Sequence, residues 1–99
     1  MIIQGSQAKR GKFGEKLHVN GATMEMRYWE DIPRGFSFSP HDFPADIAGF
    51  VVKGKGVWII DGQEYVTGEG DSYYLPLGTA YGLEVLEDFS AVEVVSRVT

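Results

Sequence analysis

Residues 70–81 read Gly70-Asp-Ser-Tyr-Tyr-Leu-Pro76-Leu-Gly78-Thr-Ala-Tyr81. Glycine adopts backbone conformations that other residues avoid, and proline fixes φ and lacks a backbone donor. Gly70, Pro76 and Gly78 therefore mark two turns on either side of a short strand at 72–75. The segment predicts a chain built from short strands and tight turns.

The same organisation continues on both sides of this segment. Asp61-Gly62 separates two apolar runs, and Asn20-Gly21 separates 17–19 from 23–30. An Asn-Gly pair is a strong hairpin signal because a type I′ turn needs positive φ at both central residues. Further strands are expected at 48–52, 81–86 and 90–98, and no segment has helical periodicity. Seven or more short strands predict an all-β sandwich or barrel.

Alternation in 23–30 assigns its side chains to two faces. Glu25 and Arg27 lie on the polar face, and Trp29 shares it. We expect the opposite face to line the interior, together with Trp58. That face consists of Met24, Met26 and Tyr28.

Length and composition restrict the class of protein. Ninety-nine residues make one domain, 1–99, in which 1–16 is an N-terminal arm or an edge strand. No segment resembles a signal peptide or a membrane span, so a cytoplasmic protein without a membrane partner is expected. The net charge is −5, and residues 56–96 carry eight acidic residues and no Lys or Arg. Nucleic acid is therefore not an expected partner.

Residues 35–98 resemble the cupin family. Gly70, Pro76 and Gly78 match the motif G-x5-P-x-G-x2-H, and Tyr81 occupies its histidine position. Gly35, His41 and Gly54 match the first motif, G-x5-H-x-H-x3-E-x6-G. The resemblance implies a double-stranded β-helix, also called a jelly roll.

In this family three histidines and a glutamate hold a divalent metal ion. The resemblance places those four positions at His41, Phe43, Ile47 and Tyr81, so one ligand of four is kept. We therefore expect no metal cofactor. The alternative is a divalent transition metal held by His41 and Asp46, with Tyr81 or Glu84, which would require a bulge that turns Asp46 inward.

The resulting hypothesis is a metal-free cupin that binds a small organic molecule in the barrel mouth, with His41 and Tyr81 as polar anchors. The other expected ligand-binding residues are Phe43, Met26, Tyr28 and Trp58. One alternative is an enzyme of sugar-acid or related metabolism, an activity found in similar small cupins, with His41 and Tyr81 as catalytic acid and base. Another is a non-catalytic dimeric interaction module.

A homodimer is expected because 48–52 is apolar throughout and because Trp29 lies on a polar face. His18 is expected at the surface. The remaining acidic residues near the C-terminus are expected to form a solvated face: Glu84, Glu87, Asp88 and Glu93.

Overall fold

The computed structural model describes residues 2–97 and consists of antiparallel strands, with one 3-10 turn, η1 (Gly5–Gln7), before them. The strands are β1 (Lys9–Arg10), β2 (Lys16–Asn20), β3 (Met24–Ile32), β4 (Ser37–His41), β5 (Asp46–Ile60), β6 (Gln63–Gly68), β7 (Ser72–Leu75) and β8 (Tyr81–Ser96). The expected all-β jelly roll is confirmed. Val98, the expected end of the last strand, lies outside the described residues.

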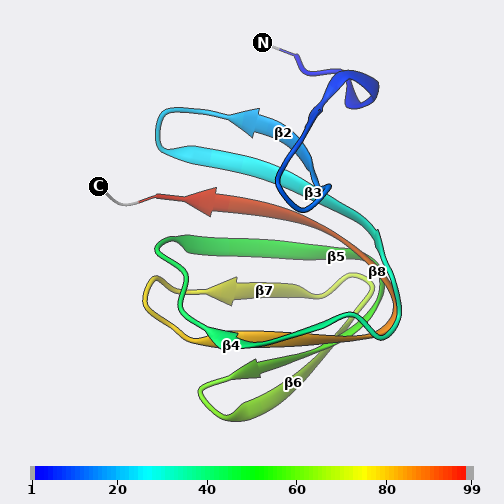
Figure 1. Cartoon of the computed structure of the whole chain (residues 1–99), viewed down its shortest axis with the longest axis vertical. Coiled ribbons are helices and arrows are strands. Elements are labelled where there is room, and N and C mark those ends of the chain that lie inside the picture. Colours follow the sequence, from blue (N-terminus) through cyan, green and yellow to red (C-terminus); the bar gives the residue numbers. More distant parts are fainter. Residues whose placement is uncertain (1, 98–99) are drawn as a thin grey trace.

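Two long strands, β5 and β8, connect two layers (Figure 1). The C-terminal half of β8 pairs with β3 and with the N-terminal half of β5, which also pairs with β7. The N-terminal half of β8 pairs with β4 and with the C-terminal half of β5, which also pairs with β6. Both strands bend along one side of the molecule, so their halves belong to facing layers.

Gly54 lies at the bend of β5, where the pairing register with β8 shifts three times between Val51 and Gly56. Its φ is 90°, and a Cβ at this position would come within 2.0 Å of the Asp88 carbonyl oxygen. Both the backbone conformation and the close contact therefore require glycine. The closing glycine of the first cupin motif thus allows the strand to pass from one layer to the other.

The two predicted hairpins have different turns. Asp61 and Gly62 both have positive φ, 50° and 79°, as a type I′ turn requires. Asn20 and Gly21 do not, and a longer loop closes there through Gly21 N–H donating to Met24 O. The hairpin is confirmed at both places, but the type I′ geometry predicted at Asn20-Gly21 is wrong.

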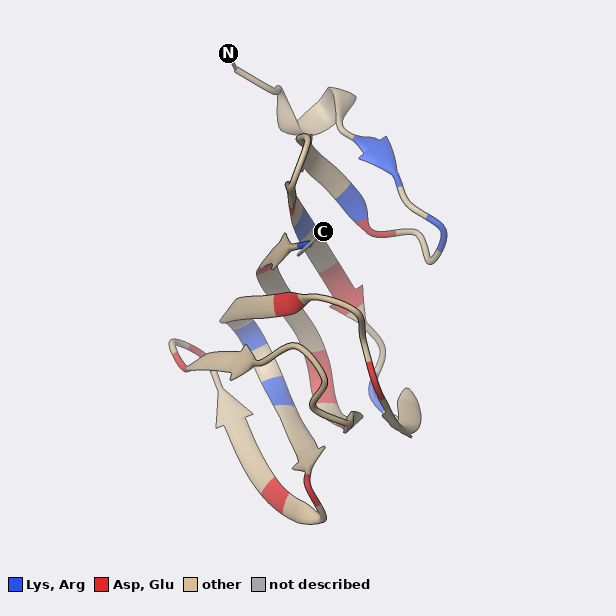
Figure 2. Ribbon diagram, turned by 90° about the vertical axis from the view of Figure 1, so that its left-hand side faces the viewer, with Lys and Arg blue, Asp and Glu red and all other residues tan. Residues whose placement is uncertain are grey.

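The N-terminal segment forms an edge of the first layer, because β1 pairs with β2. This hairpin carries the basic residues Lys9, Arg10 and Lys16, whereas acidic residues are spread over much of the remaining chain (Figure 2). No helix in residues 2–97 is long and apolar enough to cross a membrane.

The core lies between the layers, where the long strands contribute alternate side chains. Its fully buried large members are Phe89, Ile47, Leu75, Val51, Val85 and Val95. The faces of β3 are the reverse of those predicted. Met24 is 49% exposed and Met26 is 38% exposed, whereas Glu25 is 6% exposed. Alternation shows which side chains share a face, but it does not show which face points inward.

Candidate functional site

Aromatic side chains surround His41 and Tyr81 at one end of the barrel, the barrel mouth. His41 ends β4 and pairs in register with Tyr81, the first residue of β8. Their ring centroids are 6.0 Å apart, and Phe43 stacks on Tyr81 with centroids also 6.0 Å apart. Phe38 lies against both His41 and Tyr81, at 5.3 and 6.1 Å. The structure therefore brings together three predicted site residues, with His41 and Phe43 coming from the end of β4 and the loop after it and Tyr81 from the start of β8.

The polar groups of this cluster differ in solvent access. His41 is exposed, with Nδ1 3.0 Å from the Ser39 carbonyl oxygen. Tyr81 is only 5% exposed, and its hydroxyl has no hydrogen-bond partner among residues 2–97. No fully buried side-chain nitrogen or oxygen in that range lacks a partner, so the Tyr81 hydroxyl must reach solvent. Burial of the ring, and then the nearby Glu93 carboxylate, raise the pKa of Tyr81 above its ordinary value.

Trp58 forms the inner wall of this cluster. It is buried, with its ring 6.1 Å from Tyr81 and 4.4 Å from Tyr73. Its Nε1 donates to Thr67 Oγ1 at 3.1 Å, which satisfies the one polar atom of the indole. The predicted position of Trp58 inside the barrel is confirmed.

The residues at the family's metal positions do not fit a metal ion. Phe43 and Ile47 have no lone pairs, and the raised pKa of Tyr81 disfavours a phenolate ligand. Ile47 is buried in the core. The part of the chain that the structure describes contains no group of three or more His, Asp or Glu side chains that could hold a metal.

The alternative set of metal ligands is not assembled either. Asp46 and Ile47 continue in regular register with β8, so no bulge turns Asp46 inward. Its Oδ1 instead accepts a hydrogen bond of 2.6 Å from Leu77 N–H. Glu84 is exposed on the outer side of β8. Within residues 2–97, His41, Asp46 and Glu84 therefore do not come together as a group that could hold a metal.

A buried carboxyl lies deeper inside the barrel. Glu93 is 8% exposed, and each of its oxygens accepts one hydrogen bond. Trp29 Nε1 donates to Oε1 at 2.8 Å, and Tyr73 Oη donates to Oε2 at 2.6 Å. Burial raises the pKa of Glu93, and these two donors and the Arg27 guanidinium oppose that shift. The expectation that Glu93 belongs to a solvated face is wrong, whereas Glu84, Glu87 and Asp88 are exposed.

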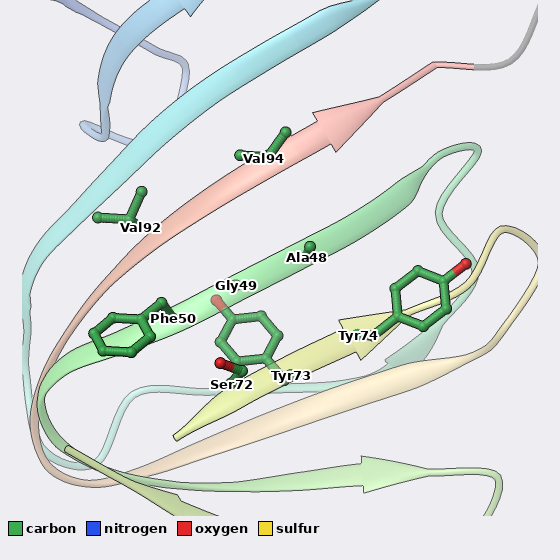
Figure 3. Close-up of a pocket in the computed structure, with 8 residues that line it drawn as sticks. All are labelled: Ala48, Gly49, Phe50, Ser72, Tyr73, Tyr74, Val92 and Val94. Carbon is green, nitrogen blue, oxygen red and sulfur yellow. The ribbon is translucent and has the colours of Figure 1, made fainter. Parts of the chain in front are cut away.

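The approach of Tyr73 to Glu93 depends on Gly49. In the sheet, Tyr73 of β7 pairs with Gly49 of β5, which pairs with Glu93 of β8. A Cβ at Gly49 would lie 2.0 Å from Tyr73 Cζ. The phenol ring therefore crosses the space where a side chain at Gly49 would be, and Figure 3 shows the ring extending toward Gly49.

A second buried acid interacts with two arginines. Glu25 Oε2 accepts from Arg27 Nε at 3.0 Å and lies 2.9 Å from Arg27 Nη2, and Glu25 Oε1 pairs with Arg97. Trp29, Arg27 and Glu25 thus all point into the barrel from β3. Sequence reasoning missed this polar interior. A usable signal was Glu93 itself, a single acid within the apolar segment 91–95.

Met26 and Tyr28, predicted to bind the ligand, lie on the outer face of the sheet. They line an open concavity of about 350 Å³ with His18, Val52 and Val92. A second concavity, of about 500 Å³, shares Val92 with the first. Its lining also includes Phe50, Tyr74, Ala48 and Val94 (Figure 3). We call these outward-facing residues the outer apolar face. His18 lies at this surface, as expected.

Comparisons with known proteins agree with this architecture. The cupin domain matches residues 27–96. No curated protein matches the sequence. KdgF from Halomonas sp. is 19% identical, with a TM-score of 0.85, over 100% of this chain and 96% of that chain. An RmlC-like cupin from Shewanella frigidimarina is 17% identical, with a TM-score of 0.86, over 98% and 90%.

A conserved protein of unknown function from Streptococcus pyogenes is also similar. It is 22% identical, with a TM-score of 0.77, over 100% of this chain and 81% of that chain. At these identities the solved structures show the fold alone. Because the cupin domain matches more than half of the residues, the chain belongs to the cupin family.

Proposed function

We propose that this cupin binds a small organic molecule in the barrel mouth and does so without a metal ion. The observation that carries the proposal is the Tyr81 hydroxyl, which is open to solvent on a buried ring and has no partner in residues 2–97. Binding sites for small molecules combine apolar walls with a few polar groups that set orientation. Phe43 and Trp58 are the walls of this site, and Tyr81 and His41 are its polar groups.

The experiment combines metal analysis with a thermal-shift screen. We expect purified protein to contain far less than one equivalent of iron, manganese, nickel or zinc. Sugar acids and small aromatic carboxylates are the compounds to screen. A compound that raises the melting temperature of the wild type should have little effect on Tyr81→Phe or His41→Ala.

His18→Ala is the matched control, because the only other histidine lies on the outer face. This variant should respond to the compound as the wild type does. One equivalent of tightly bound metal would contradict the metal-free proposal. A response that survives in both Tyr81→Phe and His41→Ala would place binding elsewhere.

Acid–base catalysis on a sugar acid is the second candidate function, and the buried Glu93 carboxyl favours it. Carboxyl groups with a raised pKa are candidates for proton transfer. Small cupins with similar turn motifs include lyases and isomerases that act on sugar acids. Turnover of a sugar acid that is lost in Glu93→Gln and in His41→Ala would support this function. Turnover that survives both substitutions would contradict it.

Homodimerisation is a separate proposal, and the outer apolar face favours it. Phe50 is 49% exposed, and Met26, Val52 and Tyr74 are also exposed on this face. Contiguous exposed apolar surface is typical of protein–protein interaction sites. Trp29 no longer supports the dimer, because its indole points into the barrel and bonds to Glu93.

A further inference from the structure

The outer apolar face includes a histidine, His18, at a bulge in β2. The pairing register of β2 with β3 shifts between Leu17 and Val19, so His18 is the extra residue of the bulged strand. His18 is half-buried and lines the concavity of about 350 Å³. Its ring lies edge-on to Tyr28, with the centroids 6.5 Å apart. The bulge therefore carries a titratable imidazole on a surface that is otherwise mostly apolar.

The surroundings of His18 give a protonated imidazole no acidic partner. Among residues 2–97, no acidic side chain lines either concavity of the outer apolar face, and no ion pair includes His18. From β3, Arg27 lines the same concavity, and its guanidinium pairs with Glu25. Glu30, also on β3, pairs with Lys16 of β2 at 3.5 Å. The side chains that β5 and β8 contribute to this concavity are apolar: Val52 and Val92.

The same lack of acidic residues suits this face to a second copy of the chain. Each copy has a net charge of −5, so two copies repel each other over most of their surfaces. On the outer apolar face they can meet without placing one acid against another. The two concavities share Val92, so the face is continuous from β7 to β2. A two-fold dimer uses the same face of both copies, and it therefore buries two His18 side chains.

We infer that the outer apolar face pairs with a second copy while His18 is neutral, and that protonation of His18 separates the two copies. The inference rests on the homodimer proposal and adds its regulation. A charged group that is buried without a partner costs much more free energy than a neutral one. Histidine is the side chain that ordinarily changes charge between pH 5 and 8. Because two copies of His18 enter the interface, two protons oppose association.

The test measures dimer affinity at two pH values. Sedimentation equilibrium of the full chain at pH 7.5 and 5.5 gives the dissociation constant of the dimer, and circular dichroism at each pH checks that the chain stays folded. We expect the dissociation constant to rise about ten- to a hundredfold at pH 5.5. Glu93 does not account for such a change through unfolding. Burial raises the pKa of Glu93, so its contribution to folding grows as the pH falls.

Three variants assign the response to His18. His18→Gln and His18→Phe are uncharged at both pH values, and His18→Phe also keeps a ring beside Tyr28. Each should dimerise with nearly the same dissociation constant at pH 7.5 and 5.5. His41→Gln is the matched control, because His41 lies in the aromatic cluster of the barrel mouth and not on the outer apolar face. It should keep the pH response of the wild type.

The outcomes separate this inference from the homodimer proposal. A wild-type monomer at pH 7.5 would contradict both. A wild-type dimer with the same dissociation constant at both pH values would overturn the inference and leave the homodimer proposal intact. A pH response that persists in His18→Gln or His18→Phe would also overturn it, because another group would then control association. Loss of the response in His41→Gln would have the same meaning.

Discussion

Tyr73 donates a 2.6 Å hydrogen bond to Glu93 across an intervening strand, over the space that Gly49 leaves open. This hydrogen bond connects β7 to β8, two strands that are each paired with β5, which lies between them. A buried carboxyl is costly to leave without partners. The φ of Gly49 is not positive, so its backbone conformation does not require glycine. Glycine is required here by packing, because the Tyr73 ring occupies the space of a side chain.

Gly49→Ala should destabilise the protein by about 1–3 kcal/mol, because the new Cβ would displace the Tyr73 ring and weaken its bond to Glu93. Urea unfolding followed by fluorescence measures this change. Gly68→Ala is the control, since its Cβ would have no neighbour closer than 4.0 Å. Equal stabilities of the two variants would show that Tyr73 can reach Glu93 by another path.

Glu93 should also affect how stability depends on pH. Because burial raises its pKa in the folded state, folding favours the protonated carboxyl. Its contribution is therefore largest below the ordinary glutamate pKa of about 4.3 and declines as pH rises toward the folded-state value. The charged or titratable groups that act on it are Tyr73, Arg27 and Glu15.

Glu93→Gln removes this titration and keeps an acceptor for Trp29 Nε1. We expect the free energy of unfolding of the wild type, relative to this variant, to fall with pH above about 4.3, by at most about 1.4 kcal/mol per pH unit. Unfolding in urea at several pH values measures the difference. A difference that rises with pH would mean that the folded state favours the charged carboxylate.

Gly54 and Gly78 distinguish two reasons why a position requires glycine. Both have positive φ, 90° and 83°, but only Gly54 faces a close backbone atom, the Asp88 carbonyl oxygen. Gly78→Ala should cost about 1–2 kcal/mol from backbone strain alone. Gly54→Ala should cost clearly more, because the bend of β5 must open to admit the methyl group. Similar losses in thermal unfolding would show that the bend adapts without cost.

The sequence allowed the fold to be predicted because turn residues report local backbone geometry. Gly54, Asp61 and Gly62 all have positive φ, a conformation that few residue types adopt, and each lies at a bend or a turn. The interior was harder to predict. Glu25 and Arg27 look like solvated residues of an alternating strand, yet they pair with each other inside the barrel. Their burial depends on which layer covers β3, and local periodicity carries no information about that.

The mouth residues could be predicted only through the family motif. His41 and Tyr81 are 40 positions apart in the sequence, and they meet because β4 pairs with the start of β8. Glu93 lies outside both motifs, and Tyr73 occupies a variable position of the second, so neither motif marks them. Their contact depends on the absence of a side chain at Gly49, which only the three-stranded register of β7, β5 and β8 reveals.

The outer apolar face should mediate dimer formation. Phe50→Glu places a charge at its exposed centre, beside Val92 and Tyr74, so burying this face against a second copy would require desolvating that charge. We expect light scattering to give the mass of a dimer for the wild type and of a monomer for this variant. Tyr65→Glu is the matched control, because Tyr65 is similarly exposed, at 48%, but lies on β6 away from this face. A wild-type monomer at high concentration would contradict the proposal, and so would a dimer that Phe50→Glu leaves intact.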